Sequence, residues 1–137
     1  MKLDHIGVAV KDLDATLCAY EALGLTAVHG EKVEKDGVEV AFVPFAGGRF
    51  ELLQPERTDS PVAKFLARRG PGLHHVALEV VDIRQQLAQL REAGVRLIDQ
   101  EPRRGADHSW VAFIHPESTG GVLLELVERT REVGADG

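Results

Sequence analysis

An internal repeat that spans nearly the whole chain is the feature that most restricts the fold. Residues 3–10 read Leu-Asp-His-Ile-Gly-Val-Ala-Val and residues 73–80 read Leu-His-His-Val-Ala-Leu-Glu-Val, so a histidine returns at the same place about seventy positions later. The apolar runs at 40–43 and 50–53 also return, in the same order, in the second half. The chain is therefore one supersecondary unit written twice, and such units bury their apolar faces against each other.

Chain length indicates whether the two copies can fold separately. The chain has 137 residues, of which 44% are hydrophobic, and this is enough for one ordinary domain with a core. Two independent domains would have about 60 residues each, a size at which the core is marginal. We therefore expect a single domain over 1–137, in which the copies pack together or against copies in a second chain.

Charge and hydropathy argue against several classes of protein. Sixteen Lys and Arg residues against twenty-two Asp and Glu residues give a net charge of -6 without a basic block, which argues against a nucleic-acid partner. No run of eighteen apolar residues occurs, and no basic-then-apolar segment starts the chain, so we expect a cytoplasmic protein without a membrane partner. The single cysteine, Cys18, excludes an internal disulfide, and its place among Leu13, Leu17 and Tyr20 predicts a buried, inert thiol.

Each copy is predicted to run strand, helix, strand, strand, strand. The first helix is expected to begin near Asp12 or Asp14, either of which can cap it, and to end at Gly24. Module one covers about 1–57, and its expected strands are 3–10, 26–29, 38–44 and 49–53.

A short helix at about 60–69 is predicted to connect the copies, because Ser60 can cap it and Pro61 can occupy its first position. Module two covers about 72–128, with a helix from about Asp82, and is followed by a polar tail, 129–137, that should fray. The expected strands of module two are 72–80, 96–98, 110–114 and 122–127. Helices that alternate with strand groups indicate an α+β fold, in which two four-stranded sheets curve around a shared cleft.

The repeat also supplies two histidines and two glutamates at equivalent places. His5 and His75 lie early in each copy, and Glu51 and Glu125 lie late, where alternation would place each glutamate on the face opposite its leucine neighbours. A lone strand histidine is usually a satisfied core or surface residue, and a lone strand glutamate usually faces solvent. Matched pairs in both copies are hard to assign to chance, and imidazole with carboxylate suits borderline divalent metals. We therefore predict one metal site built from the four residues.

The other histidines have no such match. His74 should point to the face opposite His75, which makes it a weaker candidate ligand. His115 precedes Pro116 in a turn, where a structural role is expected, and His108 lies in a loop that can contact a substrate.

These features resemble the vicinal oxygen chelate (glyoxalase-like) superfamily and, within it, the methylmalonyl-CoA epimerase family. The resemblance covers nearly the whole length. Many members of the superfamily share the metal residues, whereas two stretches are more particular to the epimerases: Ser-Pro-Val-Ala-Lys-Phe-Leu at 60–66 and Thr-Gly-Gly-Val-Leu-Leu-Glu-Leu at 119–126.

The resemblance implies a fold, a cofactor and a reaction. The fold would be the paired βαβββ module, usually as a homodimer, and His5, Glu51, His75 and Glu125 would bind one divalent ion. Cobalt is favoured, and zinc, nickel, manganese or magnesium is possible. The reaction would be epimerisation of methylmalonyl-CoA, an acyl-CoA substrate, between its 2R and 2S forms through a metal-stabilised enolate. Glu125 resembles the family's base that also touches the metal, and Glu39 stands where some epimerases have a second catalytic carboxylate.

The resemblance also draws attention to cations and to one departure from the pattern. Four cationic side chains, in the linker helix or a later loop, are available for the phosphates of coenzyme A: Lys64, Arg68, Arg103 and Arg104. The loop at 103–110 contains Asp107 and Trp110, where related epimerases are often glycine-rich and basic.

Three other functions compete with epimerisation. Lactoylglutathione lyase shares the fold, the His-Glu-His-Glu set and an enolate-type intermediate, but the stretch at 60–66 favours the epimerase. Antibiotic-sequestering proteins of the same fold do no chemistry and generally lack the metal residues, which this chain retains. An extradiol dioxygenase is less favoured, because its iron is held by two histidines and one carboxylate and its chain is usually longer.

Overall fold

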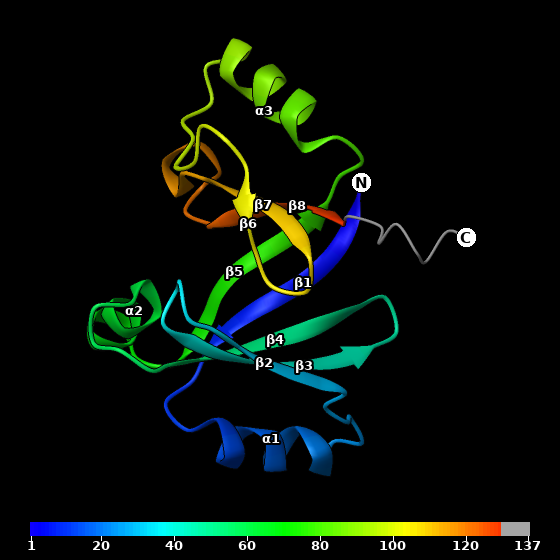
Figure 1. The fold of residues 1–137 in the computed structure, drawn as a ribbon, viewed down its shortest axis with the longest axis vertical. Coiled ribbons are helices and arrows are strands. Elements are labelled where there is room, and N and C mark those ends of the chain that lie inside the picture. The colour runs from blue at the N-terminus through cyan, green and yellow to red at the C-terminus, as the bar shows by residue number, and fades with distance from the viewer. Residues whose placement is uncertain (130–137) are drawn as a thin grey trace. The chain divides into compact units, whose positions relative to one another are not determined.

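The structure, a computed structural model, describes residues 1–129, and its elements follow the predicted repeat (Figure 1). The first copy consists of β1 (Lys2–Ala9), α1 (Leu13–Ala22), β2 (His29–Val33), β3 (Val38–Phe45) and β4 (Gly48–Pro55). After α2 (Pro61–Arg69), the second copy consists of β5 (Gly72–Glu79), α3 (Ile83–Glu92), β6 (Arg103–Arg104), β7 (Ser109–Ile114), a short 3₁₀ helix η1 (Pro116–Ser118) and β8 (Leu124–Arg129). The predicted βαβββ order is confirmed in both copies.

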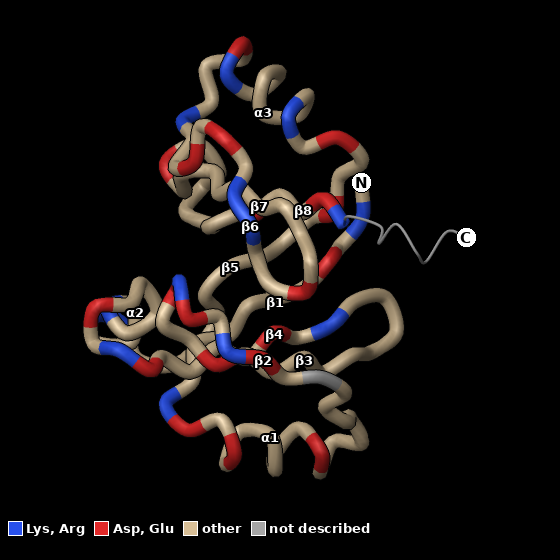
Figure 2. The backbone as a smooth tube through the Cα atoms, viewed as in Figure 1, with Lys and Arg blue, Asp and Glu red and all other residues tan. Residues whose placement is uncertain are grey.

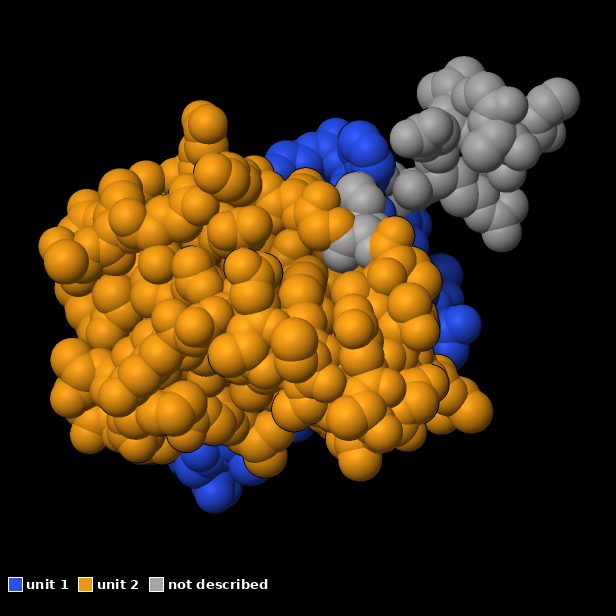
Figure 3. Space-filling model, turned by 90° about the horizontal axis from the view of Figure 1, so that it is seen from below, with its two compact units in different colours: residues 1–4, 76–137 blue, residues 5–75 orange. Residues whose placement is uncertain are grey.

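The chain divides into two compact units, which Figure 3 colours separately. One unit is residues 5–75, and the other is residues 1–4 together with the chain from residue 76 onward. The boundaries fall inside β1 and β5, not between the two copies. His5 and His75 therefore belong to the same unit although they come from different copies of the repeat.

In the unit 5–75, the strands lie in the order β2-β3-β4-β1. β2, β3 and β4 pair antiparallel, and β4 pairs parallel with β1. Helix α1 begins where the side chain of Asp12 accepts a hydrogen bond from the Ala15 amide at 3.1 Å. Its Leu13 packs against Val43 and Leu52 of the sheet, and Figure 1 shows α1 lying along one side of these strands.

The second unit repeats this arrangement with the strand order β5-β8-β7-β6. β5 pairs parallel with β8, as β1 does with β4. Helix α3 is capped by Asp82, and Ile83 and Leu87 pack against Ile114 and Leu126. In both units the helix therefore covers one face of the strands and leaves the other face for different contacts.

Helix α2 has the sequence signals predicted for it. The buried Ser60 hydroxyl accepts a hydrogen bond from the Ala63 amide at 3.0 Å, Pro61 occupies the first turn, and Gly70 ends the helix with a φ of 76°. Figure 2 shows basic residues along α2, whereas α1 carries acidic ones. None of the helices within residues 1–129 combines the length and the hydropathy needed to cross a bilayer.

Three local predictions are wrong. The second strand was expected at 26–29 but lies at 29–33, because Val33 and Val38 pair directly on either side of the hairpin turn and so fix the strand next to it. Cys18 is exposed, since the inner face of α1 follows Leu13 and Leu17 and the next residue is turned about 100° away. The expected strand at 96–98 is reduced to a single bridge from Leu97.

The edge position beside β7 is occupied by β6, a two-residue strand that the sequence did not predict. Of the predicted polar tail, only residue 129 is described, and it belongs to β8. The rest of that prediction, 130–137, lies outside the described residues.

Candidate metal centre

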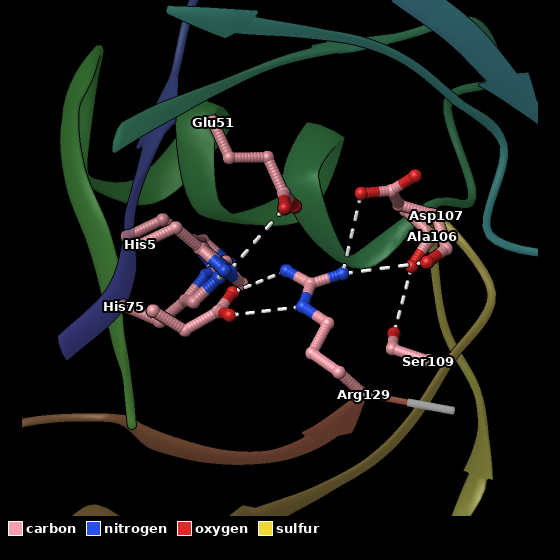
Figure 4. A network of polar contacts seen from close by, with 9 residues as sticks. His5, Glu51, His75, Ala106, Asp107, Ser109 and Arg129 are labelled. Atoms are coloured by element: carbon pink, nitrogen blue, oxygen red, sulfur yellow. Dashed lines mark hydrogen bonds and ion pairs between the residues drawn. The ribbon is translucent and has the colours of Figure 1, made fainter. Parts of the chain in front are cut away.

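Three of the four predicted ligands meet in the unit 5–75 (Figure 4). Nε2 of His5 lies 3.0 Å from Nε2 of His75 and 3.3 Å from Oε2 of Glu51. All three side chains are buried, with His5 only 3% exposed. His75 and Glu51 therefore each bring a donor atom next to Nε2 of His5.

Strand register explains why these side chains share a face. Gly7 of β1 pairs with Glu51 of β4, which in turn pairs with Phe42 of β3. Because side chains alternate along a strand, Glu51 lies on the face opposite Leu52, and Leu52 packs in the α1 core. The predicted alternation is confirmed, and we call this second face, which carries His5, Phe42 and Glu51, the ligand face.

A glycine makes room for the second histidine. A Cβ atom built on Gly7 would lie 2.1 Å from Cε1 of His75, far closer than real atoms approach. The His75 ring therefore occupies the space that any larger residue at position 7 would fill. No local pattern in the sequence indicates this role for Gly7, because the contact joins two strands far apart in the chain.

His74, the weaker candidate ligand of the two neighbouring histidines, contacts His75 directly. Its Nδ1 lies 2.9 Å from Nδ1 of His75, and its ring makes an edge contact with Phe65 of α2, with centroids 4.9 Å apart. A proton on Nδ1 of His75 directed at His74 leaves the Nε2 lone pair of His75 available to a metal. The contact thus orients the His75 ring, and it is compatible with the tautomer that a ligand needs.

The donor set fits a divalent ion. Adjacent ligands on an octahedral ion with bonds of about 2.1 Å lie about 3.0 Å apart, and the separations around His5 are 3.0 and 3.3 Å. Imidazole nitrogen with carboxylate oxygen is also the donor chemistry that cobalt, nickel, zinc and manganese accept.

Glu125, the fourth predicted ligand, belongs to the other unit. It lies on β8 opposite Phe113 of β7 and Ala77 of β5, and it is 6% exposed. Its neighbour Leu126 packs in the α3 core, so the predicted placement of Glu125 on the opposite face is confirmed. Ala77 is the second residue after His75 along β5.

Glu39, expected as a second catalytic carboxylate, lies on the other side of its sheet. It pairs with Gln54, three residues from Glu51, so its side chain leaves the sheet on the α1 side. Glu31 of β2 pairs with Val40 and is on the ligand face instead. The sequence missed Glu31 because the strand that carries it was placed too early.

An ion-paired network in the second unit was also missed. The Arg129 guanidinium donates to both oxygens of Asp4, with Nε to Oδ1 at 3.0 Å, and its Nη1 lies 3.4 Å from the Asp107 carboxylate (Figure 4). Asp107 and His108 have left-handed φ values of 57° and 55°. Nothing in the sequence indicated this role for Arg129, which was assigned to the tail.

The remaining candidates have ordinary partners or open surroundings. Lys64 and Arg68 are exposed on α2. Arg103 lies 3.6 Å from Asp99, and Arg104 stacks over Trp110 at 4.1 Å. Nδ1 of His115 accepts a hydrogen bond from the Glu117 amide, which confirms its structural role.

Comparison with known proteins identifies relatives along most of the chain. Residues 4–113 match the model of the Glyoxalase/Bleomycin resistance protein/Dioxygenase superfamily. The mitochondrial methylmalonyl-CoA epimerase of Bos taurus is 40% identical over 91% of this chain and 73% of its own.

Solved structures agree with the sequence relatives. The crystal structure of methylmalonyl-CoA epimerase from Mycobacterium tuberculosis superposes with a TM-score of 0.91, at 40% identity, over 98% of this chain and 91% of the other. A methylmalonyl-CoA epimerase in complex with methylmalonyl-CoA and NH4+ gives a TM-score of 0.88 at 40% identity, over 94% of each chain. The vicinal oxygen chelate fold expected from the family resemblance is thereby confirmed.

Proposed function

Because the chain belongs to the Glyoxalase/Bleomycin resistance protein/Dioxygenase superfamily, we propose that it is a metal-dependent epimerase that interconverts the 2R and 2S forms of methylmalonyl-CoA. The observation that carries the proposal is the buried cluster of His5, Glu51 and His75, in a chain whose relatives are named methylmalonyl-CoA epimerases. The complex of one such relative with methylmalonyl-CoA supports the choice of substrate.

In this proposal the ligands are His5, Glu51, His75 and Glu125, and the ion is divalent, with cobalt favoured and zinc, nickel, manganese or magnesium as alternatives. Support for Glu125 comes from its burial and from its place opposite Ala77, two residues beyond His75 on the same strand. The bound ion would act as a Lewis acid toward the thioester carbonyl and so lower the energy of the enolate.

The protein's own residues perform the proton transfer. Glu125, as a carboxylate, removes the proton from carbon 2 or, as a carboxylic acid, returns one. The apolar neighbours Val111 and Val127 on its face of the sheet keep water away from a carbanion-like centre. A second acid–base group must act from the opposite side of carbon 2, because inversion requires removal and return on different faces.

Coenzyme A binding is assigned to exposed cations. Lys64 and Arg68 are on α2, and Phe65 of the same helix contacts His74, the neighbour of the ligand His75. Phosphates bound by these two cations would therefore be held by the helix that contacts the ligand cluster. Arg103 and Arg104 are further candidates. We also infer that the protein is cytoplasmic and forms a homodimer, the usual assembly of the family that it resembles.

Proton exchange is the decisive test of the reaction. Methylmalonyl-CoA is incubated in heavy water with the cobalt-loaded protein and with the metal-stripped protein, and deuterium at carbon 2 is followed by NMR or mass spectrometry. Fast, metal-dependent exchange with inversion is expected. No exchange, with turnover of a methylglyoxal–glutathione mixture instead, would assign the lyase reaction. Ligand binding without metal and without turnover would favour sequestration.

Glu125→Gln separates the base from the metal ligand. The amide oxygen of glutamine can still approach a cation but cannot take a proton, so turnover should fall by about 100-fold or more even when the variant is metal-loaded. Metal content, measured by atomic emission, is compared with turnover in the same sample. Full activity in a metal-loaded Glu125→Gln variant would remove Glu125 from the role of base.

A further inference from the structure

Inversion at carbon 2 needs two acid–base groups, and we infer that Glu31 is the second one, in addition to the proposed Glu125. The inference rests on the proposed function, since a second group is required only if a proton leaves one face of the carbon and returns to the other. Neither the repeat nor the family resemblance indicates a role for Glu31.

Few carboxylates are available for this role in the unit that holds the ligand cluster. The acids on its described strands, residues 5–9, 29–33, 38–45, 48–55 and 72–75, are Glu31, Glu39 and Glu51. Glu51 belongs to the cluster, and Glu39 leaves the sheet on the side covered by α1. Glu31 is thus the strand carboxylate that remains on the ligand face.

Register fixes the position of Glu31 relative to the cluster. Glu31 pairs with Val40, and Val40 pairs with Leu53, which is two residues from Glu51 on β4. Two strand spacings separate β2 from β4, or roughly 10 Å. An acyl group held at the ligand cluster on this face therefore lies on the side of the sheet from which Glu31 projects.

The surroundings of Glu31 suit a proton-transfer group. Its side chain is half-buried, and the strand neighbour between it and β4 is Val40, which has no polar atoms and is 1% exposed. Arg49 provides a cation on the same face, with its guanidinium 4.0 Å over the ring of Phe42. The Glu31 carboxylate can extend over the apolar Val40 side chain toward the substrate. The Arg49 guanidinium would attract the free carboxylate of that substrate to the same face.

The hairpin that presents Glu31 is held in place. Arg57 donates hydrogen bonds to the carbonyl oxygens of Glu34 at 2.6 Å and Lys35 at 3.4 Å, and the Glu56 amide donates to the Gly37 carbonyl at 2.7 Å. These contacts tie the turn that follows Glu31 to the end of β4. The position of Glu31 therefore does not depend on its edge strand alone.

The chemical step balances without an added reactant. For one epimer, the Glu31 carboxylate removes the proton at carbon 2, and the electrons of the broken C–H bond move into the thioester carbonyl. Glu125, as a carboxylic acid, then forms the new C–H bond on the opposite face. Glu31 returns its proton to water and Glu125 takes one up, and the other epimer reacts with the roles reversed.

Glu31→Gln should uncouple exchange from inversion. The variant is incubated in heavy water with pure (2R)- and pure (2S)-methylmalonyl-CoA in separate reactions. We expect inversion to fall by about 100-fold or more, while the epimer whose proton faces Glu125 still exchanges deuterium without inverting. The other epimer should do neither, and bound metal should stay at the wild-type level.

Matched variants decide the assignment. Glu34→Gln, which makes the same charge change at an exposed residue of the same hairpin, should exchange and invert both epimers at the wild-type rate. Glu31→Asp should recover part of the inversion that Glu31→Gln loses, which shows that the strand is intact.

Several outcomes would overturn the inference. The first is inversion at the wild-type rate in Glu31→Gln. The second is an equal loss of exchange from both epimers together with loss of bound metal. The third is exchange without inversion of one epimer only in Glu39→Gln instead of Glu31→Gln. If the wild-type protein exchanges neither epimer, the proposed function fails, and this inference fails with it. If the wild type exchanges both but Glu31→Gln behaves like it, Glu31 alone is excluded.

Discussion

His75 can occupy its position only because residue 7 has no side chain. Within the unit 5–75, the imidazole lies where a Cβ on Gly7 would be, 2.1 Å from Cε1. The arrangement of the ligands therefore depends on the absence of a Cβ atom at Gly7 as well as on the histidines themselves.

Gly7→Ala should therefore disturb the centre more than its size suggests. The added methyl must displace His75 or bend β1, at a cost of about 1–3 kcal/mol in the free energy of unfolding, and metal affinity should fall at least about tenfold. Denaturant unfolding and calorimetric metal titration measure the two effects. Gly30→Ala on β2 is the control, because its Cβ would meet only the Val40 carbonyl oxygen at 3.3 Å. Equal metal binding by wild type and Gly7→Ala would contradict the steric argument.

His74 tests how much the partner of a ligand contributes. His74→Phe keeps the contact with Phe65 but removes the nitrogen at 2.9 Å from His75, and metal affinity should drop about 10- to 100-fold. His74→Asn, whose side-chain oxygen can replace Nδ1 as acceptor, should lose less. The control is His115→Asn, which removes a histidine that caps a turn elsewhere. Identical affinities for His74→Phe and His74→Asn would argue against the hydrogen bond as the cause.

Site residues that have a counterpart in the other copy of the repeat could be predicted from the sequence. Site residues without such a counterpart could not. His5, Glu51 and His75 were identified because each has a counterpart in the other copy, and the structure brings these three together. Gly7 and Arg129 act through contacts between segments far apart in the chain, which no local pattern records. The role of Glu39 could not be judged from sequence, because a one-residue change of register moves a side chain to the other face.

Among the elements, the β2–β3 hairpin depends on a residue outside it. Arg57 donates to two carbonyls of the turn, and it also donates to Asp59 at 3.0 Å. The hydrogen bond and the charge of Arg57 hold the pKa of Asp59 below its usual range. The stabilising pair is therefore complete above the ordinary pKa of an aspartate and is lost as the pH falls through the lowered value.

Arg57→Ala should loosen the hairpin without unfolding the protein. We expect faster hydrogen exchange at the turn amides of Asp36 and Gly37, a loss of about 1 kcal/mol in global stability, and a rise of the Asp59 pKa to its ordinary range. NMR measures the exchange rates and the Asp59 titration on one sample. Arg69→Ala, at an exposed residue of α2, is the control. If the Asp59 titration does not move, Arg57 is not the cause of its lowered pKa.

Elements with strong end signals were predictable, and edge strands were not. Caps and glycines fixed α1, α2 and α3 because those signals act within four residues. β2 and β6 are held by their neighbours in the sheet, and their own sequences, rich in charge, have little strand preference. Since β2 carries Glu31, the error in placing it also concealed a candidate acid–base residue.

For the molecule as a whole, the repeat was sufficient to predict the fold. Because each copy alone is too small for a stable core, the sequence implied that two βαβββ modules cooperate, and the relatives confirm that fold. The division into units 5–75 and 1–4 with 76 onward could not be foreseen, since it cuts through β1 and β5 rather than between the copies.

Metal binding should stabilise the folded chain measurably. The proposed ligands come from four separate strands, so the unfolded chain cannot match them, and metal at a hundred times its dissociation constant adds about 2.7 kcal/mol. For a chain of this size, the melting temperature should rise by roughly 5–10 °C, and a chelator should reverse the rise. His5→Ala should abolish the metal-dependent shift, whereas His115→Ala should retain it. A shift that survives His5→Ala would place the ion elsewhere.

The contact between Gly7 and His75 also constrains how the two copies can have diverged since duplication. Ala77 stands in the second copy where Gly7 stands in the first, so the copies differ at the position that admits the ring. A change at residue 7 becomes tolerable only after residue 75 has become smaller, which would remove a ligand. Evolutionary substitutions at these two positions should therefore be coupled, and a family alignment should show glycine at position 7 wherever histidine is kept at position 75.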